Sequence, residues 1–313
     1  MRLLKTKLII LCALMMCALM LFLSACGGPK PDDQKESSIA PPHQDTSIPI
    51  ETVDLDGFSI DYFKFGNGEK VFVILPGLSM QSVMNSAEVV ANSYERLTTE
   101  CTVYVFDQRT ALPDSYPVSE MAKDTIAAFK ALGLKDIYLY GASMGGMTAM
   151  EIAAMEPGLV KKLMLVSTCA NVSGEQQKTL DEWEKLAEKK DLEGLFLNFG
   201  ESLYPSDVFE SVKEPLLEAA KITTDEELHR FRILLRGMMG FNVTDKLASI
   251  ECPVLTLGDK GDKIFGPNAM AEIAEHFKDR ADSEYYQYEG YAHAVYDLAP
   301  DFTERLLAFI KTE

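Results

Sequence analysis

The segment GASMG at residues 141–145 constrains the fold of this chain more than any other feature of its sequence. It follows an apolar run at residues 136–140 that is typical of a buried strand, and it precedes a helix-like segment at residues 146–156. Ser143 therefore stands in a sharp turn between a strand and a helix. Such a turn brings the positions two before and two after the serine together, so we expect glycine at both because no space remains for side chains.

Strand-like and helix-like segments alternate along the chain from about residue 51. A hairpin is expected at residues 53–64, and a helix at residues 87–97. Apolar runs typical of strands then occur at residues 71–75, 102–106, 161–166, 253–257 and 284–288. Because strands alternate with helices, the sequence predicts an α/β domain with a mainly parallel sheet covered on both faces. A length of roughly 260 residues fits one domain with an insertion better than two independent units.

On these features the chain resembles the α/β-hydrolase superfamily from about residue 51 to residue 313. The resemblance rests on G-x-S-x-G between a strand and a helix, followed by an acidic loop and then a histidine-containing loop. It implies the α/β-hydrolase fold, in which a mainly parallel eight-stranded sheet has an antiparallel edge, helices on both faces and an inserted helical lid. It also implies Ser143 as a nucleophile, and it implies no cofactor.

His293 is the candidate general base. A serine hydroxyl is a poor nucleophile near neutral pH, so a neutral imidazole has to take its proton and later return it to the leaving group. His293 lies in the loop after the strand expected at residues 284–288, where the family places its catalytic histidine. The other three of the four histidines are adequately explained as solvated or packed side chains: His43, His229 and His276.

The acidic partner of the histidine has two candidates in the loop GDKGD at residues 258–262. A carboxylate is required to orient the imidazole and to stabilise the imidazolium that forms. The family's usual spacing places this acid at Gly261, which Asp259 and Asp262 flank, as if one residue were inserted. We favour Asp262, and interpret Asp259 as a turn residue that accepts hydrogen bonds from its own backbone.

Two backbone amides are expected to form an oxyanion hole for the tetrahedral intermediate. One is the amide of Met144, directly after the nucleophile. By resemblance the other is the amide of Leu78, in the loop after the strand at residues 71–75. Many relatives carry a histidine where this chain has Pro76, but a backbone donor does not depend on that side chain.

A helical lid is expected at about residues 174–246, because more than eighty residues separate two successive strands of the sheet. Five residues are candidates for an adaptable apolar wall of the pocket, although ordinary packing explains each of them as well: Met144, Met147, Met238, Met239 and Phe241. The loop after residue 106 lacks the glycines that relatives often have. Asp107 and Arg109 remain there, and we interpret them as a structural ion pair.

The N-terminus predicts export and lipidation. Arg2, Lys5 and Lys7 precede an apolar run at residues 8–23, which is typical of a secretory signal peptide at residues 1–25. The sequence LSAC at residues 23–26 resembles a bacterial lipobox, which implies a diacylglyceryl group on Cys26. Residues 26–50 are rich in proline and polar residues and are expected to form a flexible tether. The protein would then be lipid-anchored at the extracytoplasmic face of the cell membrane.

Charge and cysteine content limit the partners. The chain carries a net charge of −18, and loss of the three cations of the signal peptide would give −21. An acidic surface disfavours nucleic acids and anionic lipid headgroups. Cys101, Cys169 and Cys252 remain in the exported domain and are predicted to be free and buried, since the resemblance to the family implies that the last two lie at opposite ends of neighbouring strands. The sequence contains no cluster of metal-ligand residues and does not define an oligomeric state.

Taken together, these features predict a membrane-tethered serine hydrolase. It would cleave a carboxylic ester or related acyl bond of a small-molecule substrate through a Ser143-His293-Asp262 triad and an acyl-enzyme. A lactonase or a carbon–carbon bond hydrolase of the same fold is an alternative, because the GASMG motif does not choose among them. A non-catalytic ligand-binding protein that retains the fold is the alternative from another class.

Overall fold

The computed structural model describes residues 47–312. The predicted signal peptide, Cys26 and most of the tether lie outside these residues. Eight strands form one sheet in the order β1-β2-β4-β3-β5-β6-β7-β8. Their bounds are β1 Ile50–Leu55, β2 Phe58–Phe65, β3 Lys70–Leu75, β4 Cys101–Arg109, β5 Ile137–Ala142, β6 Val160–Val166, β7 Val254–Asp259 and β8 Glu284–Tyr288. The pairs β1 with β2 and β2 with β4 are antiparallel, and the other five pairs are parallel. The predicted mainly parallel sheet with an antiparallel edge is confirmed.

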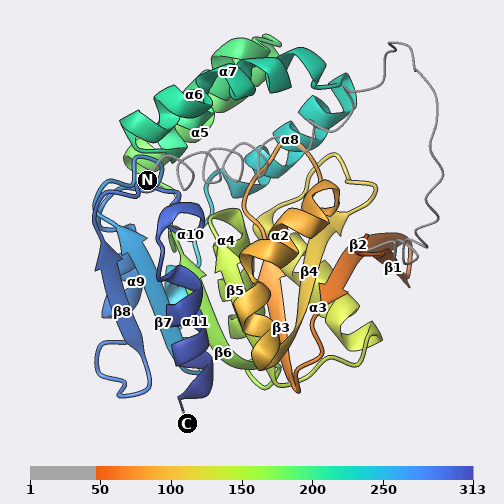
Figure 1. The fold of residues 1–313 in the computed structure, drawn as a ribbon, viewed down its shortest axis with the longest axis vertical. Helices are drawn as coiled ribbons and strands as arrows, with labels where there is room; N and C mark the ends of the chain where they lie inside the picture. Colours follow the sequence, from red (N-terminus) through yellow and green to blue (C-terminus); the bar gives the residue numbers. More distant parts are fainter. Residues whose placement is uncertain (1–46, 313) are drawn as a thin grey trace, which may run out of the picture.

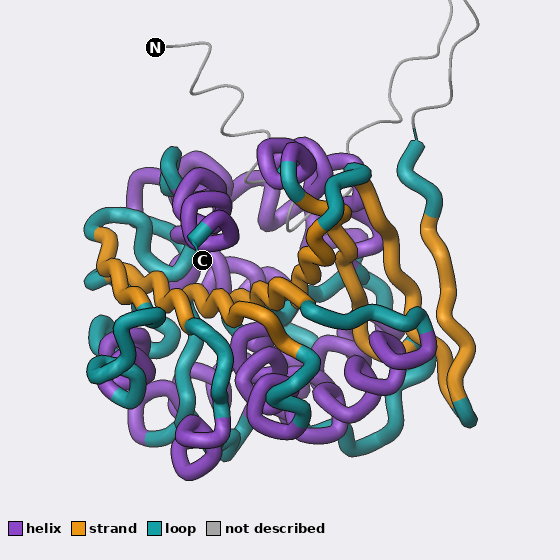
Figure 2. Tube along the Cα trace, turned by 90° about the horizontal axis from the view of Figure 1, so that it is seen from below, coloured by secondary structure: helices purple, strands orange, loops and turns teal. Residues whose placement is uncertain are grey.

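Helices cover both faces of the sheet, and a group of four helices lies across one end of it (Figure 1). Figure 2 shows the strands as a row with helices on either side. The helices that flank the sheet are α2 Ala87–Ser93, α3 Val118–Ala131, α4 Met144–Met155, α9 Ala269–Glu275, α10 Val295–Leu298 and α11 Phe302–Lys311. The lid consists of α5 Gly174–Glu188, α6 Leu192–Leu203, α7 Ser206–Ile222 and α8 Asp225–Met238, between β6 and β7. Within residues 47–312, no helix is both long and apolar enough to cross a bilayer.

Strand residues alternate between two hydrophobic clusters, because successive side chains of a strand point to opposite faces. In β3, Val73 and Leu75 join the cluster that contains α3, α4, α9 and the lid. Phe72 and Ile74 join the second cluster, which contains α2 and α11. Both clusters consist of buried side chains, so the parallel strands are apolar on both faces.

The expected helix at residues 87–97 is divided in two. The α-helix α2 ends at Ser93, and a 3₁₀ segment, η2 Glu95–Thr99, follows Tyr94. The Ser93 hydroxyl donates a hydrogen bond to the carbonyl of Val89, which is the kind of local contact that competes with helix continuation. The chain therefore turns at Tyr94 and places its ring in the core beside Tyr140.

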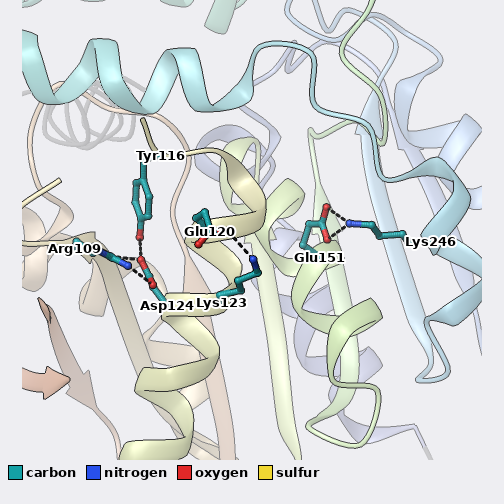
Figure 3. A network of polar contacts seen from close by, with 7 residues as sticks. All are labelled: Arg109, Tyr116, Glu120, Lys123, Asp124, Glu151 and Lys246. Atoms are coloured by element: carbon teal, nitrogen blue, oxygen red, sulfur yellow. Dashed lines mark hydrogen bonds and ion pairs between the residues drawn. The ribbon is translucent and has the colours of Figure 1, made fainter. Parts of the chain in front are cut away.

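The predicted pair of Asp107 and Arg109 is wrong. Arg109 instead forms an ion pair with Asp124 of α3, which also accepts a hydrogen bond of 2.6 Å from the Tyr116 hydroxyl (Figure 3). Hydrogen bonding to Asp124 raises the pKa of Arg109. Asp107 pairs with Arg230 of the lid helix α8. Each residue therefore finds its partner on a helix that is distant in the sequence, which local spacing could not indicate.

The lid is joined to the main domain by polar contacts at several points. Besides Arg230 with Asp107, Gln176 of α5 donates a side-chain hydrogen bond of 2.9 Å to the carbonyl of Phe265. At the return from the lid, Lys246 donates bonds of 2.8 and 2.7 Å to both carboxylate oxygens of Glu151 on α4 (Figure 3). These contacts hold the lid over the strand ends from which the turn of Ser143 begins.

The three cysteines of the described residues are free and buried, as the sequence predicts: Cys101, Cys169 and Cys252. Burial raises the pKa of the Cys101 and Cys252 thiols to about 11 in each case. Burial also raises the pKa of Cys169. These thiols are therefore protonated and unreactive near neutral pH.

Candidate active site

Ser143 occupies a strained turn between β5 and α4. Its backbone has φ of 55° and ψ of −120°, an unfavourable conformation for a residue with a side chain. Hydrogen bonds on both sides hold it there. The Ser143 amide donates to the carbonyl of Val166 at 3.0 Å, and the Ser143 carbonyl accepts from the Thr168 hydroxyl at 2.7 Å. These bonds therefore fix the backbone of Ser143 in this conformation.

The glycines around Ser143 are required by close approaches of the backbone. A Cβ atom on Gly141 would lie 2.3 Å from the carbonyl oxygen of Gly145, so the two positions do meet as the sequence predicts. A Cβ atom on Gly145 would lie 2.0 Å from the carbonyl oxygen of Leu75. The turn is thus packed against the end of β3 at a distance that only glycine allows.

His293 and Asp262 are hydrogen-bonded to each other in the interior of the protein. His293 Nδ1 lies 3.0 Å from Asp262 Oδ2, and the two residues are 1% and 6% exposed. An ionised carboxylate can only accept this bond, which places the proton on Nδ1 and leaves the lone pair on Nε2. The other Asp262 oxygen accepts from the amides of Ile264 and Phe265, at 2.8 and 3.0 Å. The carboxylate therefore has three hydrogen-bond partners, one imidazole nitrogen and two backbone amides.

Asp259 has a different environment, although it lies in the same segment. It is the last residue of β7, which ends two positions later than the apolar run at residues 253–257 suggested. One of its oxygens accepts from the amide of Gly261 at 2.7 Å, and the other accepts from the amide of Tyr291 at 2.9 Å. Both oxygens thus bind backbone amides. Asp259 connects its own turn with the loop that carries His293, and it does not bond to the imidazole.

A cavity of about 120 Å³ contains Ser143 and His293 in its wall. The loop after β3 contributes Gly77 and Leu78, and the lid contributes mainly aromatic side chains: Trp183, Phe196, Phe199, Tyr204 and Phe231. Trp183 and Phe199 have ring centroids 4.6 Å apart. The cavity therefore joins the serine and the imidazole under an aromatic roof.

Comparisons with known proteins agree with this architecture. A family model described as the alpha/beta hydrolase fold matches residues 70–195. Among solved structures, MGS-M2, an alpha/beta hydrolase enzyme from a Medee basin deep-sea metagenome library, matches with a TM-score of 0.74 at 20% identity over 84% of this chain and 98% of that one. The chain has the α/β-hydrolase fold.

Two further proteins that are similar to this chain carry names of enzymes that act on different bonds. A Rhizobium rhizogenes protein named as the carbamate hydrolase RutD is 23% identical over 251 residues, which is 77% of this chain and 93% of that protein. The enol-lactonase from Burkholderia xenovorans LB400 has a TM-score of 0.72 at 16% identity, with 84% of this chain and 100% of that one covered.

The two amides expected to form an oxyanion hole lie on either side of Ser143. Met144 is the first residue of α4, so its amide belongs to a helix N-terminus. Gly77 approaches the serine so closely that a Cβ atom there would lie 3.1 Å from Ser143 Cβ, and Leu78 follows it. Within residues 47–312, neither amide donates to a protein acceptor.

The expected methionine wall of the cavity is mostly wrong. Of the five candidate residues only Met238 lines the cavity. Met144 and Met147 are buried at 1% and 0% exposure, in the cluster between α4 and the sheet. The aromatic residues of the lid take this place instead. Their helical spacing is visible in the sequence, but it could not show which face of each lid helix meets the cavity.

The remaining histidines of the described part lie away from the cavity. His229 is on α8 and His276 caps the end of α9, and neither lines the cavity. His43 lies outside the described residues. Among residues 47–312, no group of three or more histidine, cysteine or acidic side chains could hold a metal ion.

Proposed function

We propose that this α/β hydrolase cleaves a carboxylic ester or related acyl bond through an acyl-enzyme on Ser143. The observation that carries the proposal is the shared cavity of Ser143 and His293, with His293 oriented by Asp262. The names of two relatives support an acyl substrate, since carbamates and lactones are both acyl compounds. The aromatic lining favours a small substrate with an apolar part.

The proposed reaction has two halves. Ser143 Oγ attacks the carbonyl carbon while His293 Nε2 takes the hydroxyl proton, and the amides of Leu78 and Met144 stabilise the resulting oxyanion. The carbonyl carbon then loses its bond to the leaving group, which receives the proton from His293. Water attacks the acyl-enzyme in the second half, again with His293 as base, and releases the acid and free Ser143.

We assign the acid of the triad to Asp262. A catalytic carboxylate has to bond to the imidazole Nδ1, and Asp262 has this contact at 3.0 Å. Asp259 has both oxygens engaged by the amides of Gly261 and Tyr291. Its role in this proposal is to position the loop of His293.

Membrane attachment is proposed from the sequence of the N-terminus. The basic residues, the apolar run and the motif ending at Cys26 support export and lipidation, and the acidic domain would remain soluble beside the membrane. Growth of the producing bacterium with an alkyne-labelled palmitate tests this. We expect the label on the membrane fraction of the wild-type protein and its loss from Cys26→Ser, while label on both proteins would contradict the assignment.

The proposed chemistry is tested by the intact mass of the full-length protein after treatment with a fluorophosphonate. We expect one adduct on Ser143, absent from His293→Ala, because the probe reacts only with an activated serine. Circular dichroism of each sample confirms that the protein is folded. A folded wild-type protein without an adduct would contradict the proposal and support the ligand-binding alternative.

A further inference from the structure

The cavity has a second wall whose chemistry differs from that of the aromatic lid. On the side of α2 and α10, it is lined by three tyrosines and one acid: Tyr94, Tyr140, Tyr296 and Asp297. The Tyr94 and Tyr140 hydroxyls are hydrogen-bonded at 3.2 Å, and their ring centroids are 5.9 Å apart. Tyr296 packs edge-on against His293 with centroids 6.4 Å apart. This polar wall therefore adjoins the imidazole directly.

Asp297 is the charged group of this wall that the proposed reaction does not use. It lies on α10, four residues after His293 in the sequence. Within residues 47–312, its carboxylate has no hydrogen bond or ion pair to a protein group, whereas the two aspartates near His293 bind several donors each. Its partly exposed side chain faces two cavities, since it also lines a second one of about 160 Å³ together with Tyr94 and Tyr296.

The electrostatic state of Asp297 follows from this position. Burial away from any cation raises its pKa to about 7. The groups that face it are neutral near pH 7: Tyr94 from α2, Tyr140 from β5 and its neighbour Tyr296, whose pKa values are all raised by burial. In the described residues, no lysine or arginine lines either cavity. A carboxylate that is partly withdrawn from water without a partner is costly, and a cation from outside the chain is the partner that lowers this cost.

The geometry points to a specificity subsite for an ammonium group of the substrate, formed by the carboxylate of Asp297 and the adjoining tyrosines Tyr94 and Tyr296. This inference rests on the proposed function, because it concerns the substrate of the same cavity. A carboxylate beside aromatic rings is suited to an ammonium ion, which gains an ion pair and cation–π attraction in a site of low dielectric constant. A neutral hydroxyl would satisfy the hydrogen bond without supplying the opposite charge.

Matched pairs of esters test the inference. The first pair consists of the 2-(trimethylammonio)ethyl and 3,3-dimethylbutyl esters of one acid, which share shape and differ in charge. The second pair carries the same two groups on the acyl side, as 4-nitrophenyl 4-(trimethylammonio)butanoate and 4-nitrophenyl 5,5-dimethylhexanoate. The measured quantity is the ratio of kcat/KM for the cationic ester to that for its neutral isostere. This ratio cancels the ionisation of His293, because both esters need the same imidazole.

For at least one pair we expect the wild-type ratio at pH 8 to fall by at least about tenfold in Asp297→Asn, which keeps the size of the side chain and removes its charge. Glu304→Gln is the control, since it removes the same charge from the exposed surface of α11, where Glu304 pairs with Arg96. A ratio that is unchanged in Asp297→Asn for both pairs would overturn the inference.

The pH dependence gives a second readout with a defined sign. Because the pKa of Asp297 is raised to about 7, the group is neutral at pH 6 and ionised at pH 8. The wild-type ratio should therefore rise between these values, with its midpoint near 7, because kcat/KM reports the ionisation of the free enzyme. The ratio of Asp297→Asn should stay flat. A wild-type ratio that is also flat would contradict the inference.

A binding measurement separates this inference from the proposed function. Butyltrimethylammonium carries no acyl bond, and we expect it to raise the Tm of the full-length protein and of Ser143→Ala, but not of Asp297→Asn. Stabilisation by this cation without ester hydrolysis would support the subsite while rejecting the proposed reaction. Hydrolysis of the neutral esters without cation selectivity would support the reaction and reject the subsite.

Discussion

The turn of Ser143 and the loop of Asp262 differ in what determines them. In the turn, the glycines are required by close approaches to backbone atoms, as between Gly145 and the carbonyl of Leu75. In the loop, two aspartates three residues apart have similar sequence surroundings, and only their partners distinguish them. Asp262 bonds to His293, whereas Asp259 bonds to two backbone amides. Local sterics therefore identify the serine, while long-range contacts assign the acid.

The largest effect is expected at the turn itself. Ser143→Ala should lower kcat for an ester substrate by roughly 10⁴–10⁶, because alanine has no hydroxyl with which to form the acyl-enzyme. Initial rates at saturating substrate measure it. Ser211→Ala, which removes an exposed hydroxyl of α7, is the matched control and should retain the wild-type rate. Retained turnover in Ser143→Ala would show that Ser143 is not the nucleophile. The strained turn would then have a structural role alone.

Variants of the two aspartates of the loop test whether contact with His293 identifies the acid of the triad. Asp262→Asn should lower kcat by about 10⁴, because an asparagine amide can favour the wrong tautomer of His293. Asp259→Asn keeps one acceptor oxygen for the two amides and should lower kcat by less than about 30-fold, with a lower Tm. Both are measured by steady-state kinetics and thermal unfolding.

A reversed order of the two aspartate variants would transfer the acid to Asp259. The assignment by imidazole contact would then be wrong. Equal losses in both would indicate that the loop acts as one unit, in which the position of His293 depends on both carboxylates.

A smaller effect, on the free energy of unfolding, tests whether the turn of Ser143 requires glycine at position 145. Gly145→Ala places a Cβ atom where the carbonyl of Leu75 lies 2.0 Å away, so the free energy of unfolding should fall by about 3 kcal/mol. Gly158→Ala is the control, because nothing lies within 4 Å of its Cβ position. Its unfolding free energy should change by less than about 1 kcal/mol. Urea unfolding measures the free energy of unfolding of both variants. Equal values for the two would show that the turn tolerates a side chain at position 145.

Features that depend on neighbours in the sequence could be predicted, and features that depend on distant neighbours could not. The strands, the glycines of the turn and the insertion between β6 and β7 follow from apolar periodicity and loop length. The pairing of Asp107 with Arg230 and of Arg109 with Asp124 required the packing of α8 and α3 against β4. The methionine wall was wrong for the same reason, since the rotation of each lid helix is set by its packing.

The sequence by itself determined that a serine would stand in a strained turn over a mainly parallel sheet, because glycine spacing and apolar alternation are local consequences of chain geometry. Only the tertiary structure decided which aspartate bonds to His293, which lid side chains cover the cavity, and that Asp297 lies in its wall without a partner among the described residues. These outcomes depend on contacts between segments separated by tens of residues. A side chain's partners are fixed by the packing of whole elements, which no local pattern encodes.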